Sequence, residues 1–365
     1  MKIAIMVTGY MESPIPLGVT CAPTGLAITI SEGLQTLGHK VDFYGPEGTY
    51  LNVPVVTCGL KPFINNGKGV FLYPGLEPGN EVGLGRTWNE FYMSEMIRRA
   101  QLGDYDVIMM FATIADSLIL GRLAPTVKIV YTLHDPIFPW LADIYRRFLT
   151  PNQHIISITE SQRKPAPDLN YLANIYNGID VGKYEYNDNP SDFVVFAGRM
   201  VGEKNPLGAI KAARLADTPI KLFGEVRQGE PTEYFNTSIK PQLDNNATYC
   251  GFVSQDELAK QYGKARALLA PITWDEPFGL VFIEAMACGT PVIAFRRGSV
   301  PEIIVDGVTG FIVDTVEEMA EAIKKIDTID RKACREHVVN KFSNEKMVKG
   351  YEEALKRVVE VSLDN

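Results

Sequence analysis

The sequence predicts an α/β protein of two domains, each built on a parallel sheet with helices around it. The chain has 365 residues, more than one ordinary hydrophobic core holds, which favours two domains of about 150–190 residues. Short apolar runs such as Ile3–Val7 and Phe193–Ala197 alternate with helical patterns, as the strands of βαβ units do. Each of these two runs leads into a glycine-bearing loop and then a helix.

Composition narrows the classes of function. The formal net charge is -8, so nothing supplies the basic surface that binding to a nucleic-acid backbone needs, and no nucleic-acid partner is expected. Five scattered cysteines without CxxC spacing indicate neither a disulfide framework nor a zinc site, which favours a cytoplasmic location. The first apolar stretch is too short for a signal peptide or a membrane span. Peripheral membrane contact stays open, but no pattern indicates it.

The first domain, residues 1–185, begins with a βαβ unit. Strand Ile3–Val7 is followed by a helix over Thr24–Leu37 and a strand over Val41–Tyr44. Residues 55–85 are rich in glycine and proline, which predicts irregular strands and loops. The alternation then continues with helix Trp88–Leu102, strand Tyr105–Met110, helix Ile114–Leu123 and strand Val127–Thr132.

The second domain, residues 186–345, follows a polar linker at Val181–Pro190. Its first strand leads into the loop GRMVGEKNP and a helix over Leu207–Leu215. Arg199 and Lys204 lie five positions apart on this loop, where an arginine fork and a lysine charge can converge on a diphosphate. The last helix, residues 346–365, carries an apolar stripe at helical spacing that predicts packing against another element.

The stretch WDEPFGLVFIEAMACGTPVIAFRRGSVPE, residues 274–302, organises the second domain. Pro277 disfavours helical geometry in the residue before it, so we expect Glu276 at the end of a loop. A helix is expected over Phe278–Ala287, starting next to this proline. Its first backbone amides would be free and would point the same way, as a phosphate site requires: Gly279, Leu280 and Val281.

Glu284 is an acid on an otherwise apolar helix. Burying a carboxylate is costly unless it has partners, so this position suggests a hydroxyl-bearing ligand. For a lone glutamate, a capping or surface role is the more common alternative. The spacing of Glu276 and Glu284, the intervening PFG and the apolar strand behind them favour a binding site instead.

These residues, two glutamates eight positions apart followed by EAMACGTPVIA and by PEII and DGVTGFIV, closely resemble the retaining glycosyltransferases of the GT-B fold, glycosyltransferase family four. The resemblance implies two Rossmann-like domains whose parallel sheets face a cleft, with the final helix crossing back to the first domain. It implies that Glu276 contacts the transferred sugar and that Glu284 holds the ribose. The helix amides, Arg199 and Lys204 would hold the diphosphate.

The resemblance also implies roles outside this stretch. The family commonly has a histidine where His134-Asp135 follows a strand, so His134 could bind a hydroxyl and Asp135 could transfer a proton. Loops near Arg227 and Val253 would flank the nucleotide base. The family's Gly-Gly at the start of the first helix is replaced by Cys21-Ala22, which leaves open which residue offers the donor-side amide: Gly18, Ala22 or Gly25.

The function implied is hexosyl transfer from a UDP- or GDP-sugar, such as UDP-glucose, to an acceptor hydroxyl of a saccharide, lipid or small molecule. Asp104-Tyr105-Asp106 has the DxD form of metal-dependent enzymes but leads directly into a strand, so no metal and no cofactor are expected. Two alternatives stay open, a non-hydrolysing sugar-nucleotide epimerase and a catalytically silent sugar-nucleotide-binding subunit. An epimerase would convert the donor alone into a product. A silent subunit would bind the donor but release no nucleoside diphosphate with any acceptor, whereas a transferase would release it.

Overall fold

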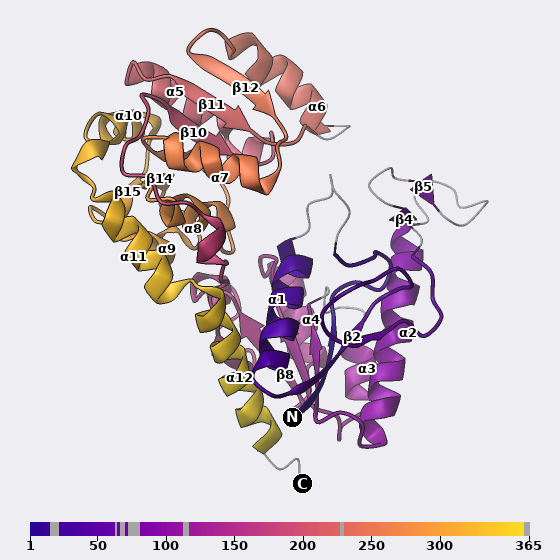
Figure 1. The fold of residues 1–365 in the computed structure, drawn as a ribbon. Coiled ribbons are helices and arrows are strands. Elements are labelled where there is room, and N and C mark those ends of the chain that lie inside the picture. Colours follow the sequence, from indigo (N-terminus) through magenta and orange to yellow (C-terminus); the bar gives the residue numbers. More distant parts are fainter. Residues whose placement is uncertain are drawn as a thin grey trace. The chain divides into compact units, whose positions relative to one another are not determined.

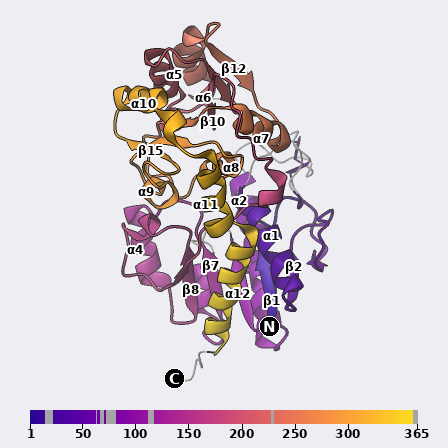
Figure 2. The same ribbon diagram turned by 60° about the vertical axis from the view of Figure 1, so that its left-hand side comes forward.

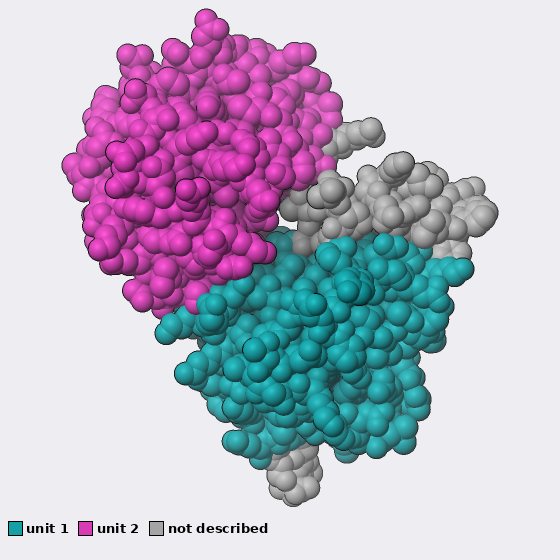
Figure 3. Space-filling model, in the orientation of Figure 1, with its two compact units in different colours: residues 1–176, 344–365 teal, residues 177–343 magenta. Residues whose placement is uncertain are grey.

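A computed structural model describes residues 1–14, 22–62, 64–65, 70–71, 81–111, 117–226 and 230–360. The chain forms two compact units, coloured separately in Figure 3. Unit 1 comprises residues 1–176 and 344–365, and unit 2 comprises residues 177–343. The predicted linker thus falls within unit 2, and the last helix is part of unit 1.

Unit 1 is built on a seven-stranded sheet in the order β3-β2-β1-β6-β7-β8-β9. Strands β2 and β8 of this sheet are labelled in Figure 1. All neighbouring strands of the sheet pair in parallel. The strands are β1 (Lys2–Met6), β2 (Lys40–Tyr44), β3 (Val55–Val56), β6 (Val107–Met110), β7 (Ile129–Thr132), β8 (Gln153–Ser157) and β9 (Tyr171–Asn174). A separate antiparallel pair joins β4 (Ile64–Asn65) to β5 (Val70–Phe71).

Helices cover both faces of this sheet because alternate residues of each strand point to opposite sides. In β1, Ile3 and Ile5 pack with α1 (Ala22–Thr36) and α12 (Asn344–Glu360), which run side by side in Figure 2. Ala4 and Met6 pack on the other face. That face is covered by α2 (Glu81–Gln101), α3 (Leu118–Arg122) and α4 (Pro139–Phe148).

Unit 2 has a six-stranded parallel sheet in the order β12-β11-β10-β13-β14-β15. Its strands are β10 (Val194–Ala197), β11 (Ile220–Phe223), β12 (Ala247–Gly251), β13 (Leu268–Ala270), β14 (Val292–Phe295) and β15 (Gly310–Val313). Its helices are α5 (Pro206–Leu215), α6 (Glu230–Tyr234), α7 (Gln255–Lys264), α8 (Leu280–Ala287), α9 (Val300–Ile303), α10 (Val316–Lys324) and α11 (Arg331–Lys341). Because the strands are parallel, the loops that follow β10, β13 and β14 leave one edge of the sheet next to each other.

Several helix boundaries differ from the sequence predictions. Helix α1 covers Ala22–Thr36 rather than Thr24–Leu37. Helix α2 starts at Glu81, within the stretch expected to be irregular, rather than at Trp88. Helix α3 starts at Leu118, and the predicted beginning at Ile114 lies outside the described residues. Helix α8 starts at Leu280, two residues later than expected. None of the described helices is both long and apolar enough to cross a membrane.

Candidate functional site

The loops at the carboxyl edge of the unit 2 sheet are tied to one another by hydrogen bonds. The Thr273 amide donates to the carbonyl of Glu203 at 2.9 Å, and the Asn205 side chain donates to the carbonyl of Pro271 at 3.0 Å. These bonds join the loop after β10 to the loop after β13. The Ser299 amide then donates to the carbonyl of Glu276 at 2.9 Å, which joins the loop after β14.

Two residues with positive φ fix this arrangement. Asn205, at φ 55°, accepts a bond from the Gly208 amide at 3.0 Å and so caps α5. Gly298, at φ +50°, passes so close to Glu276 that a Cβ here would lie 2.4 Å from its backbone nitrogen and oxygen. Glycine is therefore required at position 298, and its close approach holds Glu276 in place.

An ion pair joins Lys204 to Glu276 across these loops. The Lys204 ammonium contacts Glu276 Oε2, and the Trp274 indole donates to the same oxygen at 3.0 Å. Lys204 Nζ also lies 4.9 Å from the centre of the Trp274 ring, a cation–π distance. The two side chains are only 19% and 12% exposed, so water screens their attraction poorly.

The sequence did not predict this pairing, and it did not single out Trp274. The two predicted roles, diphosphate contact for Lys204 and sugar contact for Glu276, gave no reason to expect direct contact between them. Arg199 pairs with a different acid. Its guanidinium bonds Glu203 at 2.6 Å, and its side chain is 44% exposed. The structure therefore gives Lys204 a fixed position beside Glu276 and leaves Arg199 at the surface.

Helix α8 begins immediately after Glu276, Pro277 and Phe278. Gly279 is its N-cap with φ 84°, a left-handed conformation, whereas a place in the first helical turn was expected from the sequence. A Cβ at Gly279 would lie 2.3 Å from the Phe282 ring. Among the described residues, no acceptor is found for the backbone amides of Gly279, Leu280 and Val281. They remain available at the positive end of the helix.

Glu284 lies further along α8 and is buried, 6% exposed. Its Oε1 accepts a hydrogen bond of 2.7 Å from the side-chain amide of Gln255, the first residue of α7. Burial raises the pKa of Glu284 to about 7, against the opposing effect of contacts with Tyr184, Tyr262 and Gln255. A carboxyl group that changes charge near neutral pH is thus built into the helix. The sequence showed the unusual acid but not these three neighbours.

The residues predicted beside the base and the donor-side loop are placed only in part. Val253 is half-buried between β12 and the start of α7, two positions before Gln255. Ala22 is the exposed first residue of α1. Arg227 and Gly18 lie outside the described residues.

In unit 1, His134 follows β7 at the carboxyl edge of the sheet, as predicted from its position after a strand. Its ring stacks on Phe111, with centroids 5.8 Å apart, and Phe111 in turn contacts Tyr351 of α12. Burial lowers the pKa of His134 to about 4, so the imidazole is neutral at physiological pH. Its Nε2 is buried and has no hydrogen-bond partner, which is unusual for a buried polar atom.

Asp135 is exposed directly beside this histidine. Its backbone is held because Gln162 donates to the carbonyls of Leu133 and Asp135, at 3.1 and 2.9 Å. After β1, which lies two strands away from β7 in the sheet, the hydroxyl of Thr8 is another buried polar atom without a partner. This edge of unit 1 therefore offers unsatisfied polar atoms as well as an exposed carboxylate.

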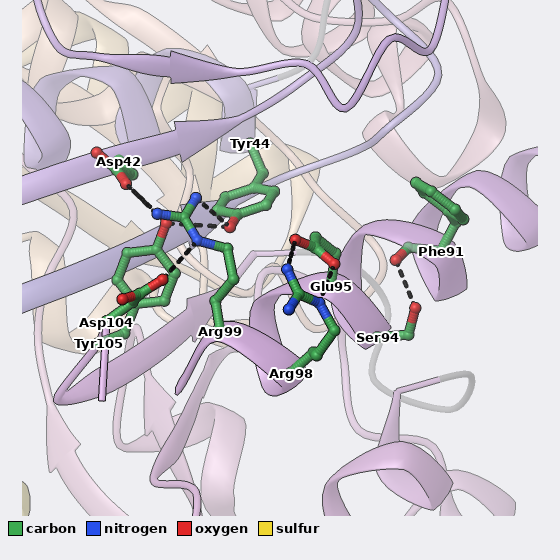
Figure 4. A network of polar contacts seen from close by, with 9 residues as sticks. All are labelled: Asp42, Tyr44, Phe91, Ser94, Glu95, Arg98, Arg99, Asp104 and Tyr105. Atoms are coloured by element: carbon green, nitrogen blue, oxygen red, sulfur yellow. Dashed lines mark hydrogen bonds and ion pairs between the residues drawn. The ribbon is translucent and has the colours of Figure 1, made fainter. Parts of the chain in front are cut away.

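The DxD motif belongs to a structural network (Figure 4). Asp104 accepts a hydrogen bond from Arg99 at 3.0 Å, and Arg99 also contacts the hydroxyl of Tyr44 at 3.1 Å. Tyr105 donates to Asp42 at 2.6 Å. Asp106 accepts from the backbone amide of Lys2 at 2.7 Å. Over the described residues, no group of three or more His, Cys, Asp or Glu side chains comes together as a metal site.

We predict that Lys204→Met destabilises the protein far more than Arg199→Met does. The first substitution leaves the poorly exposed Glu276 carboxylate without its cation, which should lower the free energy of unfolding by about 1–3 kcal/mol. The second breaks an exposed pair that contributes only about 0.5 kcal/mol. Urea denaturation of both variants and the parent measures this. Equal losses would show that the Lys204–Glu276 pair is as weak as a surface pair.

We also predict that Glu284→Gln changes how stability depends on pH. The folded-state pKa of Glu284, about 7, lies above its unfolded value of about 4.3, so its stabilising effect is complete below the unfolded value. That effect is lost as pH rises to about 7. The neutral variant lacks this loss, so its free energy of unfolding relative to that of the parent should rise between these pH values by up to about 4 kcal/mol. A constant difference from pH 4 to 8 in denaturation experiments would contradict the prediction.

The part of the chain that matches a known protein family lies almost entirely in unit 2. Residues 184–344 match the family model described as glycosyl transferases group 1. The lipopolysaccharide 1,2-N-acetylglucosaminetransferase of Salmonella typhimurium is 27% identical over 263 residues, which are 64% of this chain and 68% of that protein.

Two solved structures share the fold along nearly the whole chain. Sucrose-phosphate synthase from Thermosynechococcus elongatus has a TM-score of 0.75 at 18% identity, covering 99% of this chain and 100% of that one. The Anabaena protein HepE, in complex with UDP and glucose, has a TM-score of 0.68 at 18% identity, covering 98% and 100%. The chain therefore has the GT-B fold, and its residues 184–344 are similar in sequence to the group 1 glycosyltransferases.

Proposed function

We propose that the protein is a retaining glycosyltransferase that moves a hexosyl group from a UDP- or GDP-sugar to an acceptor hydroxyl. The observation that carries the proposal is the Lys204–Glu276 pair directly before the free amides of α8, with Glu284 further along the same helix. Cationic and amide donors suit a diphosphate, and carboxylates suit the hydroxyls of sugar and ribose. A UDP donor is supported by the fold shared with HepE, which was solved with UDP and glucose.

The diphosphate would lie at the start of α8. The amides of Gly279, Leu280 and Val281 would donate hydrogen bonds to its oxygens. The Lys204 ammonium, which contacts Glu276, would also contact an oxygen of the leaving phosphate. Arg199, which is exposed and paired only with the exposed Glu203 in its described contacts, is free to swing toward the same phosphate. These groups would stabilise the negative charge that develops as the bond to the sugar breaks. They support transfer without a metal ion.

The two acids would then divide the rest of the donor between them. Glu276 would contact the sugar, where a carboxylate stabilises the positive charge that develops on the ring. Glu284 would accept hydrogen bonds from the ribose hydroxyls. Neither acid is free to act as a covalent nucleophile in this arrangement, so attack on the same face, assisted by the leaving phosphate, is the mechanism we favour for retention.

His134 and Asp135 complete the proposal in unit 1. The unpartnered Nε2 of the neutral imidazole can donate a hydrogen bond to a substrate hydroxyl, or accept one from it, according to the tautomer. Asp135 is exposed and could receive the proton of an acceptor hydroxyl. The described cysteines carry free thiols, which supports a reducing compartment, and the cytoplasm is part of this proposal.

The proposal is tested by a panel of UDP-, GDP-, ADP- and dTDP-sugars. A donor that binds should raise the melting temperature, and with a suitable acceptor it should release nucleoside diphosphate at an unchanged rate in excess EDTA. Loss of turnover on chelation, restored by magnesium or manganese, would contradict metal independence. Conversion of the donor alone into an epimer would instead identify an epimerase, and binding without release for any acceptor would identify a silent subunit.

We predict that the two acids respond differently to substitution. Glu284→Gln exchanges two acceptor oxygens for one acceptor and one donor, so nucleoside diphosphate should bind less tightly. Glu276→Gln should spare nucleotide affinity and lower the turnover rate, because its contact strengthens as charge develops on the sugar. Calorimetric titration of nucleoside diphosphate into both variants measures the difference. Equal weakening in both would show that the roles of the two acids are misassigned.

A further inference from the structure

Gln255 holds the Glu284 carboxylate from outside its own helix. The residue opens α7 directly after the N-cap Ser254, whose hydroxyl accepts from the Glu257 amide at 3.2 Å. From this position the Gln255 side-chain amide donates to Glu284 Oε1 at 2.7 Å and contacts the hydroxyl of Tyr184 at 3.0 Å. The amide nitrogen is thus bonded on two sides.

Tyr184 is a fixed partner for this amide. It is 5% exposed, and the guanidinium of Arg335 in α11 bonds its backbone carbonyl together with those of Val181 and Ala287. Ala287 is the last residue of α8, so the same arginine joins the Tyr184 segment to the helix that carries Glu284. The Gln255 amide therefore spans two anchored elements, although Gln255 itself is exposed.

We infer that Gln255 is a positioning residue for Glu284. The Gln255 amide keeps the Glu284 carboxylate ionised and oriented so that it accepts hydrogen bonds from the two ribose hydroxyls of the nucleotide. The inference rests on the proposed function, because it takes Glu284 as the ribose ligand. A carboxylate has about four acceptor positions, and the amide uses one of them while leaving others for the ligand. A protonated carboxyl group would offer fewer acceptors and would bind the diol less well.

The surroundings of Glu284 make this support necessary. Burial alone favours the neutral acid, and no cation is paired with it in its described contacts. The titratable groups around it are the hydroxyls of Tyr184 and Tyr262 and the thiol of Cys288, while Arg331 and Arg335 of α11 act on Cys288. The Tyr262 hydroxyl is buried beside this carboxylate, and its contact lowers the pKa of Glu284. Contacts with Tyr184, Tyr262 and Gln255 favour the ionised form, and the Gln255 amide reaches the carboxylate from α7 with a hydrogen bond of 2.7 Å.

The test is calorimetric titration of UDP, with GDP as the second probe, between pH 6 and pH 8.5. Parent affinity should fall as pH drops below about 7, and Gln255→Leu should move this fall to higher pH because the ionised carboxylate loses a donor. At pH 7 the variant should bind on the order of tenfold more weakly, and the difference should shrink as pH rises. Titrating Glu284→Gln over the same range corrects for protonation of the nucleotide itself.

Gln261→Leu is the matched control on the same helix. Its amide bonds Glu257 at 2.8 Å, so this substitution also removes an amide–carboxylate bond from α7, but one without contact to Glu284. It should leave the pH profile unchanged. Weakening by the same factor at every pH in Gln255→Leu would mean that the residue only packs, and tighter binding would mean that its amide occupies the place of the ribose.

Either of those results overturns the inference while leaving the proposed function intact. If neither UDP nor GDP bound the parent, the proposed function would itself fail, and the inference with it. Melting curves of Gln255→Leu and Gln261→Leu alongside the titrations establish that both variants are folded.

Discussion

The ion pair between Lys204 and Glu276 is the interaction on which the unit 2 site depends. The partners lie 72 positions apart in the chain and on loops that follow neighbouring parallel strands. Trp274 contacts both partners, so the pair places a cation and a carboxylate side by side directly before α8. A substrate that draws Lys204 toward a phosphate would change the environment of Glu276 at the same time, so binding and the state of this acid are physically linked.

The environments of the two glutamates differ more than their spacing suggests. Glu276 faces a cation and an indole donor, whereas Glu284 is buried among neutral groups and has its pKa raised to about 7 by burial. Two carboxylates on one short segment thus lie in different electrostatic environments. This difference is the physical reason to give them different tasks, and it requires a neighbour such as Gln255 to support the buried one.

The sequence predicted the two-domain α/β class and the strand-and-helix alternation, because apolar runs and glycine loops carry those signals locally. It placed the start of α8 two residues early, since proline usually opens a helix and nothing local showed that Gly279 adopts φ 84°. The Lys204–Glu276 pair and the Gln255–Glu284 bond join residues far apart in the chain, so they could be found only in three dimensions. Arg227 and Gly18 remain predictions.

The central claim is that nucleoside diphosphate binds between Lys204 and the start of α8. A crystal structure of the protein with UDP or GDP bound tests it most directly. The account predicts diphosphate oxygens within hydrogen-bond distance of the Gly279, Leu280 and Val281 amides and of the Lys204 ammonium, with the ribose hydroxyls on Glu284. A nucleotide bound elsewhere, or a Lys204 still paired only with Glu276 and without contact to phosphate, would contradict it.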